Sequence, residues 1–324
     1  MNRRQLIVAG AAALAMPSIV RAQAKYPDRP VRLVVPFPPA GPTDIIGRMV
    51  AEKMTGLLGQ NMMVDNKAGA AGSIGAVEVK NAKADGYTFL FAPSSTHAIN
   101  PTAFVKPLYD PIKDFTPISS ICVNPLVIVA HPSMPDTLMG LVELMKKNPG
   151  KYSYGSSGAG GITHLAGEYL KMSVGGMNVE HIPYRGSMPA LQDMMSGNVA
   201  WMFETISTTL QFHRQGRVRI LGYAHAKRAP AAPDIPTVIE AGVPGYEAYT
   251  FNLILGPANT PKDVVDTIDQ ATRKLMTDAA FIESLEKIAA VPALDTTPAR
   301  TEKFIKDELA KWAPVIRAAG VKIE

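Results

Sequence analysis

The 324-residue sequence is poor in cysteine, in aromatic side chains and in excess charge. Its single cysteine, Cys122, excludes an internal disulfide framework and a zinc site built from several cysteines. Aromatic residues make up 7% of the chain, too few for the stacking surfaces that bind single-stranded nucleic acid. Hydrophobic residues make up 47%, enough for a folded core. We therefore expect a globular protein without internal disulfides.

The small positive charge is concentrated at the N-terminus. The formal net charge is +5, from 33 basic and 28 acidic residues. Three of the basic residues, Arg3, Arg4 and Arg21, lie in the first 24 positions, which contain no acidic residue. Removing these three leaves 30 basic and 28 acidic residues, a net charge of +2 without a basic run. We expect no nucleic-acid partner, because the phosphate backbone is recognised by clustered positive charge.

Residues 1–24 have the pattern of an export signal. Arg3-Arg4 precedes an apolar segment at 6–20, and Ala22-Gln23-Ala24 is a small-x-small cleavage site. This apolar segment is shorter than the about 20 residues that span a bilayer, which favours a cleaved signal over an uncleaved anchor. The arginine pair fits a twin-arginine signal as well as an ordinary secretory one. We expect a mature protein outside the cytoplasm, with the export route left open.

Apolar segments typical of strands alternate with helix-forming stretches in the rest of the chain. A first series has strands at 31–35, 62–64 and 88–92, and a second at 126–130, 152–155, 179–183, 200–203 and 219–223. A third begins with a strand at 251–255. Such alternation predicts an α/β fold with parallel strands and right-handed crossovers. At roughly 100–200 residues per domain, the length favours two domains.

Three residue pairs predict the starts of helices. They are Thr43-Asp44, Thr260-Pro261 and Thr297-Pro298. Threonine and aspartate are good N-cap residues, and proline is favoured in the first helical position. We therefore expect helices that begin at these three points.

Four loops after predicted strands have unusual sequences, and ligands bind at the carboxyl ends of strands in open parallel sheets. Loop 37–44 is rich in proline and precedes a helix, so it could bind an anion at the helix N-terminus or form a rigid capped turn. Loops 93–97 and 155–164 carry hydroxyls and glycines that could hold a carboxylate, or could be plain Ser/Gly loops. In loop 183–187, Arg185 could clamp an acid or lie on the surface.

Motifs for enzymes and cofactors are weak. Gly155-Ser156-Ser157-Gly158 is not G-x-S-x-G, because Ala159 fills the last position. Segment 158–163 lacks the last glycine of the dinucleotide fingerprint, and no Walker-type phosphate loop occurs. We expect no cofactor. His164 and Glu168 share a helix face without a third ligand, so a helix-surface pair is favoured over a metal site.

A secreted α/β enzyme that uses the serine-rich loops is the alternative to a binding function. It would need a base within hydrogen-bond reach of a hydroxyl. The candidates are His97 beside Thr96 and His164 near Ser157.

Short motifs in a fixed order along the mature chain are more specific than any single loop. They are Tyr26-Pro27-Asp28-Arg29-Pro30, Gly41-Pro42-Thr43-Asp44, Asn66-Lys67-Ala68-Gly69, Asp85-Gly86-Tyr87-Thr88, Thr96-His97-Ala98-Ile99-Asn100-Pro101, Gly155-Ser156-Ser157-Gly158, His164-Leu165-Ala166-Gly167-Glu168, Pro183-Tyr184-Arg185-Gly186-Ser187 and Pro236-Thr237-Val238-Ile239-Glu240. With these motifs the chain resembles the Bug family of periplasmic solute-binding proteins, the receptors of tripartite tricarboxylate transporters.

The resemblance implies a two-lobed α/β protein of the type II Venus-flytrap kind. Each lobe would be a mainly parallel sheet flanked by helices, with a cleft between the lobes. It places lobe 1 in residues 25–124 and 247–324 and lobe 2 in residues 125–246, with crossovers near 123–125 and 246–250. It further implies a monomer in the periplasm that binds a small carboxylic acid, delivers it to membrane permease subunits and catalyses no reaction. A receptor that reports the ligand to a signalling partner is a third reading.

The resemblance also implies which residues bind the ligand, through backbone N–H groups, hydroxyls and bridging waters. They are Pro39, Gly41, Pro42, Thr43, Asp44, Ser94, Ser95 and Thr96 on lobe 1, and Ser156, Ser157, Gly158, Thr163, Tyr184, Phe203 and Glu204 on lobe 2. Ala40 and Pro42 stand where the family commonly has glycine, and Glu204 where it usually has aspartate. If the Glu204 carboxylate reaches the cleft it could select a ligand with an amine; it could equally be held by a hydrogen bond inside its lobe.

Overall fold

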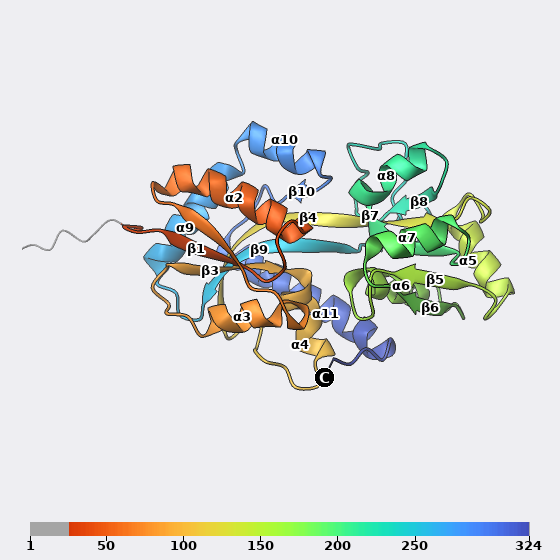
Figure 1. Ribbon diagram of the computed structural model, residues 1–324, viewed down its shortest axis with the longest axis horizontal. Helices are drawn as coiled ribbons and strands as arrows, with labels where there is room; N and C mark the ends of the chain where they lie inside the picture. Colours follow the sequence, from red (N-terminus) through yellow and green to blue (C-terminus); the bar gives the residue numbers. More distant parts are fainter. Residues whose placement is uncertain (1–25, 324) are drawn as a thin grey trace, which may run out of the picture.

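The computed structural model describes residues 26–323, which form two lobes side by side along the long axis of the molecule (Figure 1). The predicted export signal, residues 1–24, lies outside these described residues. Among the helices of residues 26–323, none combines the length and the apolar character that a membrane crossing requires.

The first lobe is built on a sheet in which β1 lies between β2 and β3. Both of these pairings are parallel, and β9 then pairs antiparallel with β3 and with β4. The short β10 pairs with β4. The strands are β1 (Val31–Val35), β2 (Met62–Asn66), β3 (Thr88–Pro93), β4 (Phe115–Ala130), β9 (Tyr249–Pro257) and β10 (Val291–Pro292).

Helices cover both faces of this sheet because its strands are apolar on both sides. Val34 packs into one core and its neighbours Leu33 and Val35 into another, as the alternation of side chains along a strand requires. One face carries α2 (Pro42–Leu58), α9 (Lys262–Leu275) and α10 (Ala279–Lys287). The other carries α3 (Ser73–Lys80), the short α4 (Asn100–Ala103) and α11 (Pro298–Ala318). Two short turns, η1 (Ala70–Gly72) and η2 (Ser95–Ile99), complete the lobe.

The second lobe repeats the three-stranded parallel arrangement. Strand β5 lies between β6 and β7, parallel to both, and the last part of β4 pairs antiparallel with β7 and β8. The strands are β5 (Ser153–Ser156), β6 (Glu180–Pro183), β7 (Trp201–Thr205) and β8 (Arg219–Tyr223). The helices are α5 (Leu138–Lys147), α6 (Ile162–Ser173), α7 (Ser187–Met195) and α8 (Ile206–Arg214).

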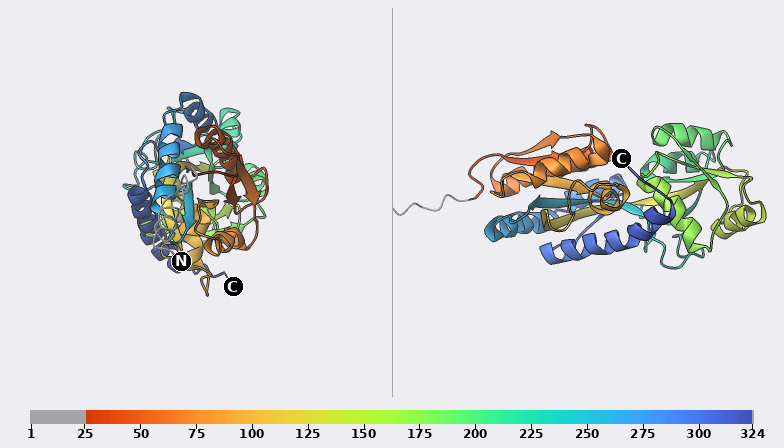
Figure 2. Two further views of the ribbon diagram at one scale, coloured as in Figure 1. Left: turned by 90° about the vertical axis from the view of Figure 1, so that its left-hand side faces the viewer. Right: turned by 90° about the horizontal axis from the view of Figure 1, so that it is seen from below.

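Strands β4 and β9 connect the lobes (Figure 1). β4 pairs with β9 as far as Pro125, opposite Tyr249, and with β7 from Leu126, opposite Thr205. The C-terminal helix adds a further link, since α11 packs against η2 in the first lobe and against α6 in the second (Figure 2). The lobes therefore share one continuous sheet at the point where the chain passes between them.

Sequence patterns predict the buried strands better than the connecting ones. The strands predicted at 31–35 and 219–223 agree with β1 and β8, and the three parallel strands of each lobe are confirmed. The first part of β4 was not predicted, because Pro117, Asn124 and Pro125 interrupt its apolar pattern. The antiparallel pairings of β4 and β9 did not follow from the strand–helix alternation either.

One of the three predicted helix starts is confirmed. The Thr297 hydroxyl accepts a hydrogen bond from the Arg300 N–H and caps α11. The other two predictions are wrong by one or two residues. Gly41 is the N-cap of α2 with Pro42 in the first helical position, and Pro261 is the N-cap of α9. Proline fixes φ but not ψ, so Pro42 is the first residue of its helix, whereas Pro261, with ψ 144°, stays outside its helix as the N-cap.

Candidate functional site

A cavity of about 520 Å³ lies between the two lobes, and we call it the cleft. Its walls come from loops that follow β1 and β3 in the first lobe and β5 and β7 in the second. Nine of the residues predicted to bind a ligand line it: Pro39, Gly41, Pro42, Thr43, Ser94, Ser95, Ser157, Thr163 and Glu204. Strand ends of both lobes thus converge on one space, as in other open α/β sheets.

Six predicted residues do not line the cleft, and their side chains are used elsewhere. Thr96 is fully buried and donates to the Pro93 carbonyl, and Tyr184 donates to Asp193 at 2.5 Å. Phe203 is in the core, with its ring stacked on that of Tyr246 at 5.8 Å between centroids. Of the remaining three, Asp44 lies in the first turn of α2, Ser156 ends β5 and Gly158 follows it, and the side chains of Asp44 and Ser156 bond to nearby backbone groups. These six therefore support the cleft from behind.

Several lining residues were missed by the sequence analysis. Thr205 ends β7 directly after the predicted Glu204, so an extension of the prediction by one residue would have found it, whereas Thr250 lies at the start of β9, where no ligand-binding residue was predicted. Asn100 lies on α4, and Ile323 comes from the C-terminal end of the chain, where it bridges to Phe104. Ile323 has no signal in its local sequence, because only the tertiary fold brings it to the cleft.

Among the helices that begin at the cleft, two, one in each lobe, have nearly the same N-cap geometry. The N-caps are Gly41 of α2 and Gly161 of α6, both extended, with φ −80° and ψ 166° in the first and φ −75° and ψ 167° in the second. Within residues 26–323, no side chain caps either of them by a hydrogen bond. The first N–H groups of a helix have no partner inside it, and they carry partial positive charge. Both lobes therefore present free donors to the cleft.

The residue before each glycine is held in the left-handed region by the third helical residue. Ala40 has φ 65°, and its N–H donates to the Asp44 carboxylate at 2.8 Å. Gly160 has φ 75°, and its N–H donates to His164 Nδ1 at 3.0 Å. In each loop the side chain thus reaches back to a backbone donor and leaves the next N–H groups open to the cleft.

Asp44 fixes the loop of the first lobe through charge. Its carboxylate also accepts from Arg48 Nε at 2.9 Å and from Asn66 Nδ2 at 2.8 Å, and Asn66 donates to the Phe37 carbonyl as well. Burial alone would raise the pKa of Asp44, but the hydrogen bonds from Arg48, Asn66 and Ala40 together lower it. Asp44 is therefore ionised at neutral pH and works as a brace for the loop.

The loop of the second lobe is fixed by neutral groups. Thr163 Oγ1 accepts from the Ser157 N–H at 3.0 Å and lies 2.8 Å from the Ser157 hydroxyl. Behind them, the His164 and His181 rings stack at 3.7 Å between centroids. Burial lowers the pKa of His164, and burial together with the neighbouring His164 lowers the pKa of His181 to about 4. Both rings are therefore neutral near pH 7. Because His164 is buried, its assignment to a helix-surface pair with Glu168 is wrong.

The cleft wall is otherwise uncharged and carries unsatisfied polar atoms. Among residues 26–323, Glu204 is the one ionisable side chain that lines it, and Arg185 does not. Three of the lining side chains have a buried polar atom without a hydrogen-bond partner in the described chain: Ser95 Oγ, Asn100 Oδ1 and Glu204 Oε2. Buried polar atoms are normally paired, so a wall of this kind favours a polar ligand.

The imidazoles predicted for an enzyme do not face hydroxyls of the cleft. His97 Nδ1 is 3.0 Å from Thr96 Oγ1, but both residues are fully buried away from it. The Nδ1 atom of His164 is occupied by Gly160, and Ser157 is bonded to Thr163 instead. In the part of the chain that the structure describes, no three His, Cys, Asp or Glu side chains come together as metal ligands.

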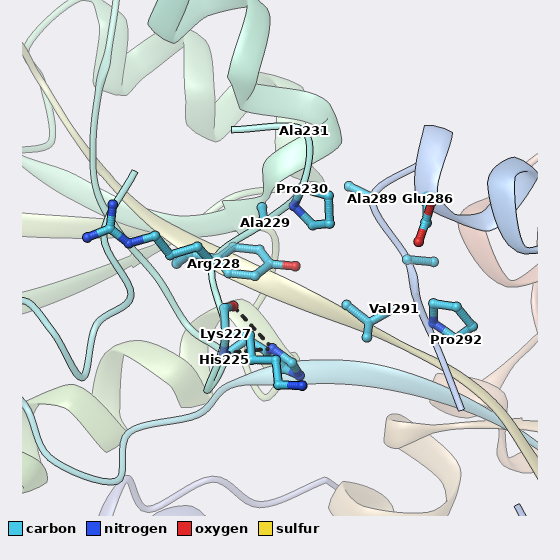
Figure 3. A pocket seen from close by; sticks show the side chains of 12 residues that line it. His225, Lys227, Arg228, Ala229, Pro230, Ala231, Glu286, Ala289, Val291 and Pro292 are labelled. Atoms are coloured by element: carbon cyan, nitrogen blue, oxygen red, sulfur yellow. Dashed lines mark hydrogen bonds between the residues drawn. The ribbon is translucent and has the colours of Figure 1, made fainter. Parts of the chain in front are cut away.

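A second cavity, of about 130 Å³, lies between the loop after β8 and the segment that ends in β10 (Figure 3). His225, Lys227 and Arg228 line it from one side and Glu286 from the other. The imidazole of His225 bonds to the backbone of Lys227, and Arg228 pairs with Glu240. None of the predicted ligand-binding residues lines this cavity, and neither of the two uncapped helix N-termini does.

Comparison with known proteins identifies the family. The profile described as "Tripartite tricarboxylate transporter family receptor" matches residues 46–321. The chain belongs to this family. Protein BugT of Bordetella pertussis is 33% identical over 301 residues, which cover 92% of each chain. A UPF0065 protein from the tcbD-tcbE intergenic region of Pseudomonas sp. strain P51 is 34% identical over 97% of this chain and 94% of its own.

Solved structures agree in fold. The periplasmic binding protein BugD is 34% identical, with a TM-score of 0.75 over 92% of this chain and all of its own. The R. palustris protein Rpa4515, solved with adipate, is 32% identical, with a TM-score of 0.78 over 92% of this chain and 99% of its own. The expectation of a two-lobed periplasmic-binding-protein fold is confirmed, and these relatives are solute-binding proteins.

Proposed function

We propose that the protein is a solute receptor that binds a small carboxylic acid in the cleft and delivers it to the membrane permease of a tripartite tricarboxylate-type transporter. The observation that carries the proposal is the pair of uncapped helix N-termini, Gly41–Thr43 and Gly161–Thr163, one from each lobe, in a wall without basic side chains. A carboxylate between them would accept hydrogen bonds from both lobes at once. Two relatives were solved with dicarboxylates, Rpa4515 with adipate and MatC with malate.

The proposal includes movement of the lobes and a cellular location. We place the pivot at residues 123–125 and 246–250, which divide the mature chain into 25–124 with 247–324 and 125–246. A ligand held from both sides stabilises the closed form by its higher affinity for that form. Family membership and the sequence pattern of residues 1–24 support export to the periplasm, and we further propose that the protein is a monomer. The protein would catalyse no reaction.

Native mass spectrometry of protein purified without denaturation tests the proposal. We expect retained ligand with the mass of a carboxylic acid, and calorimetric titration with mono-, di- and tricarboxylates should then show a 1:1 complex. Failure of every carboxylic acid to bind, including amino acids and aromatic acids, would contradict the proposal. Turnover of a bound acid by the purified protein would favour the secreted enzyme instead.

A further inference from the structure

Glu204 lacks a counter-charge in a site that is otherwise neutral. It lies at the end of β7, lines the cleft and is 3% exposed. Its Oε1 accepts from the Thr205 N–H at 2.8 Å, while Oε2 is buried without a hydrogen-bond partner among residues 26–323. The hydrogen bond inside the lobe therefore uses one of the two oxygens and leaves the other available.

The charges around Glu204 indicate which kind of group could pair with its free oxygen. In the described chain, no lysine, arginine or histidine lines the cleft, and none contributes a charge to the environment of Glu204. A buried carboxylate without a cation is costly, and the hydrogen bond that Glu204 Oε1 accepts from the Thr205 N–H compensates this cost only in part. The two helix N-termini favour the negative end of a ligand, so a compensating positive group would have to come from the same ligand.

Resting on the proposed function, we propose that Glu204 selects carboxylic acids that carry an ammonium group, with the ligand carboxylate at the helix N-termini and its ammonium paired with Glu204 Oε2. The cleft would then read both ends of a zwitterion, one by backbone donors and one by a charged side chain. An acid of the same shape without nitrogen leaves the Glu204 oxygen unpaired, which lowers its affinity.

The protonation of Glu204 provides an independent readout. Burial raises the pKa of its carboxyl, and the Ser187 hydroxyl together with the N–H and hydroxyl of Thr205 opposes this only in part. The carboxyl therefore holds its proton more strongly than an exposed glutamate when the cleft is empty. Pairing with an ammonium group favours the carboxylate, so any proton that Glu204 holds in the empty cleft is released to the solvent on binding.

Calorimetric titration with shape-matched pairs of acids tests the inference on the wild-type protein. The pairs are aspartate with succinate, glutamate with glutarate, and 2-aminoadipate with adipate. We expect the amine-bearing member of at least one pair to bind roughly tenfold more tightly or better, as a charge-assisted hydrogen bond implies. Its titration in two buffers of different ionisation enthalpy should show net release of protons.

Glu204→Gln keeps the shape of the side chain and removes the charge. It should abolish both the preference and the proton release, whereas Glu180→Gln, an exposed carboxyl of β6 in the same lobe, should change neither. Equal or tighter binding of the amine-free acids by the wild-type protein would overturn this inference and leave the proposed function intact. Persistence of the preference in folded Glu204→Gln would also overturn it. Binding of no acid of either kind would overturn both proposals.

Discussion

The two loops that face each other across the cleft have the same backbone and different chemistry. Each places a glycine at the N-cap, a left-handed residue before it and a side-chain acceptor three residues after it. In the first lobe the acceptor is the ionised Asp44, held by Arg48 and Asn66. In the second it is the neutral His164, stacked on His181. The shared geometry supports the proposal that the open N–H groups bind the ligand, while side chains of different chemistry hold the backbone in the same shape in the two lobes.

The largest loss of stability should come from removal of the Asp44 carboxylate. Asp44→Ala leaves the Ala40 and Asn66 donors without their acceptor, so we expect the free energy of unfolding to fall by roughly 2–4 kcal/mol. Urea denaturation of the mature protein measures this. The control is Asp266→Ala, which removes an exposed ion pair with Lys262 and should cost under about 1 kcal/mol. A similar, small loss in both variants would show that Asp44 does not brace the loop.

Hydroxyls on the two walls should contribute to ligand affinity from both lobes. Thr43→Ala and Ser157→Ala each remove a hydroxyl of a cleft-lining residue, and we expect each to weaken binding of the retained acid by roughly 0.5–3 kcal/mol. Calorimetric titration gives the affinities, with Ser173→Ala on the exposed end of α6 as a control. Unchanged affinity in both cleft variants would mean that the cleft loops are misassigned.

The contributions of Asp44 and His164 to the stability of the folded protein should change with pH in different ranges. The pKa of His164 is lowered by burial, so the unfolded chain takes up its proton first, near the ordinary pKa of about 6.5. Its contribution to stability is complete at higher pH and falls as the pH drops through about 6.5. The lowered pKa of Asp44 acts in the same direction, but only below about pH 4.

Unfolding measured between pH 7.5 and 5 separates the histidine from the aspartate. We expect the wild-type free energy of unfolding to decline over this range, and His164→Asn, whose amide oxygen can replace Nδ1 as an acceptor, to decline less steeply. His97 and His181 are also held neutral by burial, so part of the decline should remain. If the free energy of unfolding of His164→Asn declines as steeply with pH as that of the wild type, His164 does not contribute to the decline.

The smallest effects concern the left-handed residue of each loop. Ala40 adopts φ 65° at a cost of about 1–2 kcal/mol, part of which glycine would recover, so Ala40→Gly should be neutral or stabilising by up to about 1 kcal/mol. Gly160→Ala should destabilise by about 1–2 kcal/mol, since it adds the same strain and places a Cβ 3.1 Å from Val321. Thermal denaturation measures the stability change in each variant. A change of the same sign in Ala40→Gly and Gly160→Ala would contradict the matched geometry of the loops.

Those parts of the site that a local sequence pattern determines could be predicted from the sequence. The glycines, prolines and hydroxyls of loops 37–44 and 155–164 mark places where the backbone approaches a ligand, and most of them line the cleft. Asp44 and Ser156, predicted as ligand-binding residues, do not line the cleft and bond to nearby backbone groups, because sequence does not show to which side a residue turns. The start of β4 and the place of Ile323 depend on pairing with distant segments, so no local periodicity reports them.

The structure of the protein with its retained acid is the most direct test of the central claim, that the uncapped N-termini of α2 and α6 hold one carboxylate ligand between the lobes. We expect ligand carboxylate oxygens at about 2.7–3.2 Å from backbone nitrogens in the first turns of both helices. A ligand bound through one lobe alone, or seated in the cavity beside His225 and Lys227, would contradict it.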